Sequence, residues 1–207
     1  MVDVAREMGV ALGTVYSYVE SKEALFALVV DRALAEDRRA NAGSAPTLPL
    51  RTPEPDQILE RVRQRLEELT ALPVLQAATR RRVTRDAGEE LRAVLDELWT
   101  LIARTRLAAD MVERSARDWP ELSVLFHDRA RRDVFDRLGA YFERRDRSGQ
   151  FRCHGDAAIV ARSTLETVTF WARHRYRDPA GAGATDENAR EVILAFLMEG
   201  ITGGAKS

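Results

Sequence analysis

The sequence predicts an all-α protein. Apolar residues recur at helical spacing along the chain, no segment shows the sustained alternation of a half-buried strand, and no internal repeat is visible. The composition, 45% hydrophobic and 31% charged, is typical of a folded globular chain. Its 207 residues are enough for a small N-terminal module followed by a larger helical domain.

The clearest break in the chain is the proline-rich stretch over residues 41–55, which divides residues 1–39 from residues 40–207. Before it, short helical pieces meet at Gly9 and Gly13. One uninterrupted helix is then expected from its N-cap Ser21 to about Arg39. After the break, helices are expected over residues 58–69, 91–117, 120–147, 155–177 and 186–203, with Pro73 interrupting and Asp186 capping the last one.

Several classes of protein are disfavoured by composition. The net charge of −1 gives no general sign of nucleic-acid binding, so such binding must depend on a local motif. Cys153 is the only cysteine, and His127 and His154 have no metal-ligand spacing, so we expect no disulfide, no metal and no cofactor. No apolar run of about 18 residues and no leader are visible, so a cytoplasmic protein without a membrane span is expected.

Residues 2–25 have the pattern of a helix, a tight turn at Gly9 and a second helix. The second helix is expected over residues 12–19 and is about two turns long. Its outward residues are small or polar, which suits insertion into a major groove; they are Gly13, Thr14, Ser17 and Tyr18. The expected buried side of the pair consists of Val4, Ala5, Met8, Val10 and Val15. On the following helix, the expected apolar stripe consists of Leu25, Leu28, Val29 and Ala33.

This stretch resembles the signature of the TetR family of transcription regulators. The matching positions are Asp3-Val4-Ala5, Gly9-Val10, Gly13-Thr14-Val15-Tyr16, Tyr18-Val19 and Ser21-Lys22-Glu23-Ala24-Leu25. The resemblance implies a helix-turn-helix that binds double-stranded operator DNA. It implies that bases are faced by Ala11, Leu12, Gly13 and Ser17, and that phosphates are held by Thr14, Tyr16, Tyr18 and Lys22. From the residues alone, Tyr16 could equally be a core aromatic and Lys22 an ordinary solvated charge.

The motif departs from the family pattern in two respects. Ala11, Leu12 and Gly13 offer no strong base-binding side chain, so specificity would depend on thymine methyl groups or DNA shape. The family also has a complete helix before the motif, whereas this chain begins inside the second helix, so an incomplete three-helix bundle is expected. Residues 1–40 carry a net charge of −2, which is poor electrostatics for DNA binding. The alternative is therefore a helical ligand- or partner-binding dimer that has lost DNA binding through N-terminal truncation.

The C-terminal part, from Asp118 through the segment Thr167–Arg175, resembles the C-terminal domain of AcrR-like TetR regulators. The resemblance implies a homodimer formed through the helices over residues 156–177 and 186–203, with an effector pocket among the middle helices. An apolar or aromatic effector is expected because the candidate lining residues are mostly aromatic or apolar: Leu66, Trp99, Met111, Phe126, Phe135, Phe170, Trp171 and His174. Alternatively, the aromatic residues are plain core and His174 is solvated.

Two arginine clusters, residues 80–82 and 129–132, remain open in function. They could contact DNA or an anionic effector, or form solvated helix faces paired with nearby carboxylates. No nucleophile elbow, phosphate loop or metalloprotease motif is present, so no enzymatic activity is expected. The sequence thus predicts a ligand-responsive transcription regulator, expected to be a repressor that a small effector releases from its operator.

Overall fold

The computed structural model describes residues 1–34, 47–115, 119–153, 155–180 and 183–203. This part of the chain is helical and contains no strand, which confirms the all-α prediction; a single bridge joins Val19 to Leu50. No helix in these ranges is both long and apolar enough to cross a bilayer. The part of the first long helix expected over residues 35–39, and the end expected at residues 116–117, lie outside the described residues.

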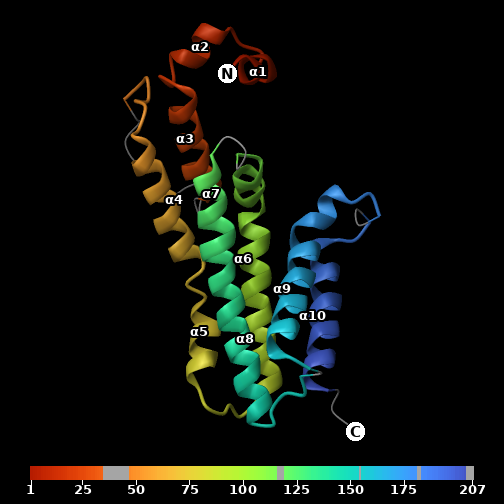
Figure 1. Ribbon diagram of the computed structural model, residues 1–207. Helices are drawn as coiled ribbons and strands as arrows, with labels where there is room; N and C mark the ends of the chain where they lie inside the picture. Colours follow the sequence, from red (N-terminus) through yellow and green to blue (C-terminus); the bar gives the residue numbers. More distant parts are fainter. Residues whose placement is uncertain (35–46, 116–118, 154, 181–182, 204–207) are drawn as a thin grey trace.

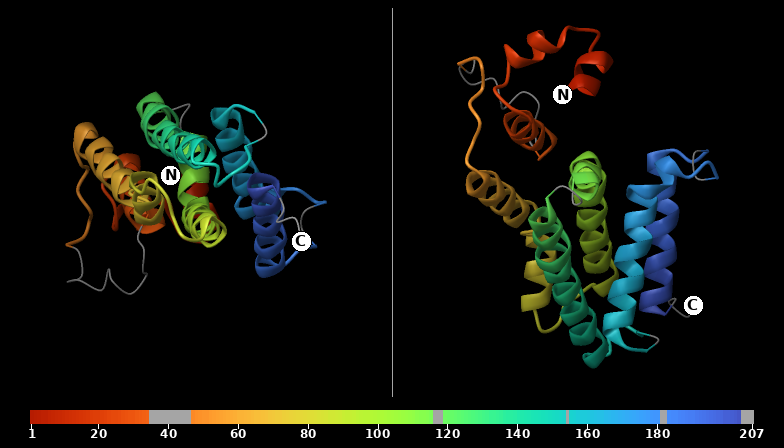
Figure 2. Two further views of the ribbon diagram at one scale, coloured as in Figure 1. Left: turned by 90° about the horizontal axis from the view of Figure 1, so that it is seen from below. Right: turned by 45° about the horizontal axis from the view of Figure 1, so that its top comes forward.

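The helices form a head, a body and a flanking pair (Figures 1 and 2). The head holds α1 (Val2–Glu7) and α2 (Leu12–Tyr16), and α3 (Lys22–Leu34) leads from it to the body. The body contains α4 (Pro55–Leu69), α5 (Pro73–Arg80), α6 (Ala87–Ser115), α7 (Pro120–Ser123), η1 (Val124–Arg131) and α8 (Arg132–Arg147). The flanking pair is α9 (Ala157–Ala172) and α10 (Asp186–Thr202), joined through the short 3₁₀-helix η2 (His174–Arg177).

Two apolar clusters hold the body together. The larger cluster joins α5, α6, α8, α9 and α10, and its fully buried members include Leu91, Leu98, Leu138, Phe142 and Val168. The second cluster joins α3, α4, α6 and α7 around Ala27, Val30, Ile58, Val62, Val112 and Leu122. The 29-residue helix α6 contributes to both clusters, with Leu91 to Trp99 in the larger one and Ala108 and Val112 in the second.

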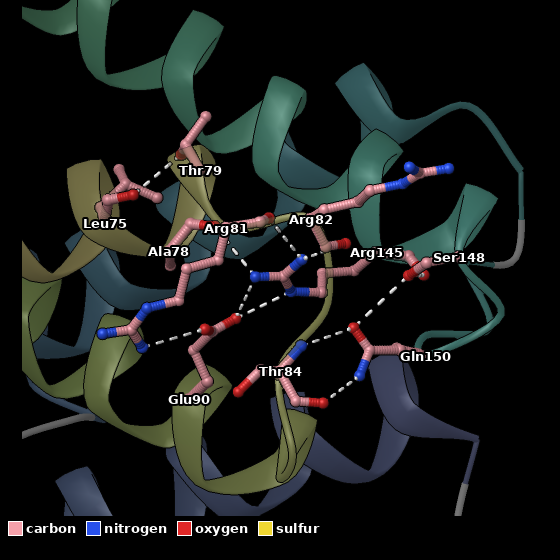
Figure 3. A network of polar contacts seen from close by, with 10 residues as sticks. All are labelled: Leu75, Ala78, Thr79, Arg81, Arg82, Thr84, Glu90, Arg145, Ser148 and Gln150. Atoms are coloured by element: carbon pink, nitrogen blue, oxygen red, sulfur yellow. Dashed lines mark hydrogen bonds and ion pairs between the residues drawn. The ribbon is translucent and has the colours of Figure 1, made fainter.

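The short helix α5 is held at both ends by charged side chains from neighbouring helices. At its N-terminus the carboxylate of Glu97 accepts hydrogen bonds from the backbone N–H groups of Val74 and Leu75, each at 2.9 Å. At its C-terminus the guanidinium of Arg145 donates to the carbonyl of Ala78 at 2.9 Å and to that of Arg81 at 3.1 Å (Figure 3). An acid at the N-terminus and a base at the C-terminus complement the helix dipole and satisfy orphan backbone groups.

Three expected helices differ in detail from the sequence prediction. The segment over residues 120–147 contains the π-helix η1 rather than a continuous α-helix. The helix expected over residues 155–177 ends at Ala172, after which Arg175 turns back and donates to the carbonyls of Trp171 and Ala184. Thr185, not Asp186, is the N-cap of α10, because its hydroxyl accepts a hydrogen bond from the N–H of Asn188 at 3.3 Å; the Asp186 carboxylate pairs with Arg175 instead.

Candidate nucleic-acid interface and ligand cavity

The head has a helix, a turn and a second helix, as the sequence predicts, but the second helix, expected over residues 12–19, ends at Tyr16. Gly9 has a φ of +67°, a left-handed conformation that glycine adopts without steric cost, and it directs α2 away from α1. Ala5 of α1 and Val15 of α2 are buried with Val19 and with Ala24 of α3. The packing of the head therefore depends on a few small side chains.

All eight residues to which DNA contact was assigned are exposed on the head. Tyr16 is 44% exposed and Tyr18 53%, so the alternative in which Tyr16 is a core aromatic is wrong. No atom lies within 4 Å of the position that a Cβ on Gly13 would occupy, so this side of α2 is open. The Ser17 hydroxyl donates to the Thr14 carbonyl at 2.6 Å.

Several apolar residues expected to be buried are instead on the surface. Met8 is 61% exposed and Val10 36%, whereas Val4 is half-buried. The apolar stripe of α3 is also rotated: Ala24, Ala27 and Val30 are buried, while Leu28 and Val29 are exposed. The reason is that the head packs against the start of α3 and Leu50 on one side only, so apolar positions on its other side find no neighbour in the described chain.

Leu50 and Thr52, near the end of the proline-rich linker over residues 41–55, contact residues 18–21 between α2 and α3. The sequence does not reveal this contact. The N–H of Leu50 donates to the Tyr18 carbonyl at 2.8 Å, and the N–H of Glu20 donates to the Leu50 carbonyl at 3.0 Å. Thr52 adds a bond from its N–H to the Glu20 carboxylate at 3.0 Å and one from its hydroxyl to the Ser21 hydroxyl at 2.8 Å. The linker thereby fixes the chain between α2 and α3.

Ser21 is the N-cap of α3, as predicted, since its hydroxyl accepts a hydrogen bond from the N–H of Ala24 at 3.1 Å. Ser21→Ala is expected to lower the free energy of unfolding by about 1 kcal/mol, because it leaves a helix N–H unpaired. Urea unfolding followed by circular dichroism measures this change. Ser21→Asp keeps an acceptor at the same position and serves as the control; an equal loss in both variants would contradict a capping role.

A cavity of about 100 Å³ lies between α4, α6, η1, the start of α8, and α9. Its walls are mostly apolar. The lining residues are Val62, Leu66, Leu69, Thr70, Leu98, Leu101, Ile102, Thr105, Ala108, Ala109, Val112, Phe126, Ala130, Arg131, Val134, Leu165, Thr169 and Arg173. Such a lining suits an apolar ligand with few polar groups.

The charged side chains in this wall are two arginines. Arg173 is 7% exposed and forms ion pairs with Asp110 at 2.8 Å and with Glu113 at 2.7 Å. Arg131 is half-buried and pairs with Glu166 at 2.7 Å. The hydroxyls of Thr70 and Thr105 donate to carbonyls of their own helices, so they offer a ligand only acceptor capacity.

Of the eight predicted pocket residues, Leu66 and Phe126 line this cavity and the other six do not. Trp99 is buried in the larger core and borders a polar recess between α6 and α10. Met111 packs against the cluster that holds α3, and Phe135 lies beside the guanidinium groups of Arg131 and Arg162. The reason for the difference is that α6, α8 and α9 carry apolar residues on several sides, and the cavity faces only one of them.

The remaining three predicted pocket residues lie near or beyond the end of α9. Phe170 is 38% exposed, and its ring contacts that of Trp171 with centroids 5.6 Å apart. His174 follows the cavity residue Arg173 but begins η2. Burial, and then the charge of Arg173, lower the pKa of His174, which favours the neutral imidazole. Cys153 is no readily ionised thiol, because burial raises its pKa to about 11.

Comparisons with models of protein families, with curated proteins and with solved structures return no match for this chain. Within the described ranges, no group of three or more His, Cys, Asp or Glu side chains is placed to hold a metal ion. The features that bear on function are therefore the head, the cavity and the packing between them.

Proposed function

We propose that the protein is a cytoplasmic, dimeric transcription regulator of the TetR type, which binds operator DNA through its head and responds to a small effector in its cavity. The sequence resemblance of residues 3–25 supports the DNA-binding part, together with the open, small-residue face of α2. Repression, relieved by the effector, is the expected direction of control.

One observation carries the proposal: the cavity and the helix below the head share one apolar cluster. Ala27 and Val30 of α3 belong to the same cluster as Val62 of α4 and Val112 of α6, and the latter two also line the cavity. α3 packs directly on α4 and α6. A displacement of the cavity wall therefore changes the surface on which α3, the helix that carries the head, packs.

The size of the cavity supports such a displacement. A cavity of about 100 Å³ is smaller than the engineered apolar cavity of about 150 Å³ that holds benzene. We expect an effector larger than this volume to displace part of the cavity wall, which α4 and α6 help to form. In a dimer, the two recognition helices must lie one DNA turn apart, about 34–36 Å, to enter successive major grooves. A displacement of α3 would alter this distance and so weaken DNA binding. A hundredfold loss of operator affinity requires that the effector prefer the displaced state by about 2.8 kcal/mol.

Fluorescence anisotropy of labelled DNA from upstream of the gene, titrated with the chain over a salt series, tests DNA binding. We expect submicromolar affinity, at least tenfold preference over scrambled DNA, and a steep loss of affinity with salt. Weak or indiscriminate binding would reject the regulator proposal for this chain and favour a ligand- or partner-binding dimer.

The dimer is proposed to form through α9 and α10. Ile159 and Phe170 of α9 are 66% and 38% exposed and lie eleven residues apart, which places them on one face of the helix. Val192 and Phe196 of α10 are 57% and 67% exposed and lie four residues apart. The two helices lie side by side (Figure 1), so their large apolar side chains offer a face for the same face of a second copy.

Phe196→Glu is expected to convert the dimer into a monomer, because it places a charge in the apolar centre of the proposed interface. Light scattering after size exclusion, at about 10 μM in view of typical dimer affinities, measures the mass. Val83→Glu is the control, since Val83 is 62% exposed but lies in the loop between α5 and α6. A native chain that is monomeric, or a Phe196→Glu variant that stays dimeric, would contradict this interface.

A further inference from the structure

We infer that the effector is a monoanionic, amphipathic molecule: an apolar chain or ring that ends in a carboxylate held by Arg131. This inference rests on the proposed function only in treating the cavity as a ligand site. The apolar part would lie against α4 and α6, and the carboxylate against α9 and η1. Four features of the described cavity support this orientation.

The first feature is the sign of the charges in the wall. Both charged residues of the lining are cationic, Arg131 and Arg173, and no Asp or Glu of the described chain is part of it. The carboxylates that pair with these arginines, Glu166 for Arg131 and Asp110 with Glu113 for Arg173, are not part of the lining. A ligand inside the cavity therefore meets positive charge first, in an apolar surrounding where ionic contacts are strong.

The second feature is an imbalance of charge around Glu166. This carboxylate pairs with Arg131 at 2.7 Å and also with Arg162 at 2.7 Å, so two guanidinium groups share one carboxylate. Around Arg173 the charges balance, because Arg177 also pairs with Asp110, leaving two arginines for two acids. At Arg131, unlike at Arg173, the partner carboxylate is therefore shared with a second guanidinium group, which leaves Arg131 more able to bind a monoanion such as a carboxylate.

The third feature is the separation of polar and apolar walls. Thr169 at the end of α9 and Arg173 just after it line the cavity, and Arg131 lines it from the end of η1. The opposite walls contributed by α4 and α6 consist of aliphatic side chains and of threonines whose hydroxyls donate to their own helix. One polar edge facing an apolar space is the arrangement that an amphipathic acid requires.

The fourth feature is the backbone that carries Arg131. It ends the π-helix η1, which also places Phe126 and Ala130 in the cavity wall. π-helical turns are rare and occur often at functional sites. In an α-helix of the same sequence, these residues would point in other directions relative to Val134 and the rest of α8. The irregular turn therefore brings an arginine and an apolar wall to the same space.

Isothermal titration of the full chain with hexanoate and octanoate, compared with hexanamide and octanamide, tests the inference. The amides have nearly the same shape but no charge at neutral pH. We expect the carboxylate to bind about tenfold more tightly than the amide of the same length. Equal binding of acid and amide, or no binding of either, would overturn the inference.

Three variants locate the contact. Arg131→Gln is expected to remove the tenfold preference and leave amide binding unchanged. Arg129→Gln is the matched control, because Arg129 lies on the same π-helix and is exposed outside the cavity lining, so the preference should persist. Glu166→Gln removes the shared carboxylate and is expected to strengthen octanoate binding several-fold, with no effect on octanamide. If Arg131→Gln weakens acid and amide equally and Glu166→Gln has no effect, the assignment to Arg131 is wrong.

These titrations contain no DNA, so their outcome separates the two proposals. Loss of the acid preference would overturn the ligand class while leaving a regulator with a neutral apolar effector intact. Tight octanoate binding that leaves operator affinity unchanged in the anisotropy assay would support the ligand class and contradict control of DNA binding by the cavity.

Discussion

Arg145→Met is expected to lower the free energy of unfolding by about 3–5 kcal/mol. The Arg145 side chain is completely buried and its Nε donates to the Glu90 carboxylate at 2.8 Å (Figure 3). Its two terminal nitrogens donate to the carbonyls of Ala78, Arg81 and Arg82. The variant leaves a buried carboxylate without its closest cation and removes the side-chain donors at the C-terminus of α5, so both losses add. Chemical unfolding followed by circular dichroism measures the change.

Two comparisons isolate the cause. Arg147→Met removes a neighbouring ion pair to Glu143, 3.1 Å long and largely exposed, and should cost less than about 0.5 kcal/mol. The double variant Glu90→Met with Arg145→Met removes the stranded carboxylate and should recover part of the loss, but not the part that belongs to the α5 carbonyls. A loss below about 1 kcal/mol in Arg145→Met would show that water replaces the guanidinium, contrary to its burial.

Gly13→Glu is expected to abolish specific DNA binding, with at least a hundredfold weaker affinity, while slightly stabilising the fold. The position lies in α2, and no atom stands within 4 Å of the added Cβ. Glutamate forms helices better than glycine by about 0.5–1 kcal/mol. A carboxylate on the surface proposed to enter the major groove, however, would be repelled by phosphates and would exclude close approach. Anisotropy with upstream DNA and thermal unfolding measure the two effects.

Gly13→Glu is expected to weaken DNA binding but to raise the melting temperature. A loss of binding therefore cannot be attributed to unfolding. Ala140→Glu on the exposed side of α8 changes the net charge equally and should leave DNA affinity within twofold at moderate salt. If Gly13→Glu binds DNA as tightly as the native chain, α2 is not the recognition helix and the DNA-binding proposal is wrong.

Helix positions were largely predictable from the sequence, because helical periodicity, prolines and caps are local signals. Ser21 caps α3 and Gly9 adopts the turn conformation expected of it, whereas Pro73, expected only to interrupt, begins the helix α5, which was not predicted. The exposure of Gly13, Thr14, Ser17 and Tyr18 follows from the same local pattern. The docking of Leu50 and Thr52 on the motif was not predictable, since a linker rich in proline gives no local sign of its partner.

The candidate cavity was predictable only in part. Leu66 and Phe126 line it, whereas Arg131 and Arg173, the two charged residues of its wall, were not among the candidates. The cluster over residues 129–132 did suggest an anionic effector as one alternative. Composition could not show that Arg131, and not the exposed Arg129, lines the cavity. The partner carboxylate Glu166 lies 35 residues away, and the π-helix changes the direction in which the side chains point.

The helical class and most helix positions follow from local sequence patterns, because each depends on residues a few positions apart. Which side of α6 and α9 faces the cavity, and which arginines are buried, depends on how distant helices pack together. Arg145, for example, is separated from Glu90 by 55 residues and from the α5 carbonyls by more than 60. A buried charge is stable only where its hydrogen-bond and ion-pair partners lie close to it. The packing of whole helices brings those partners together.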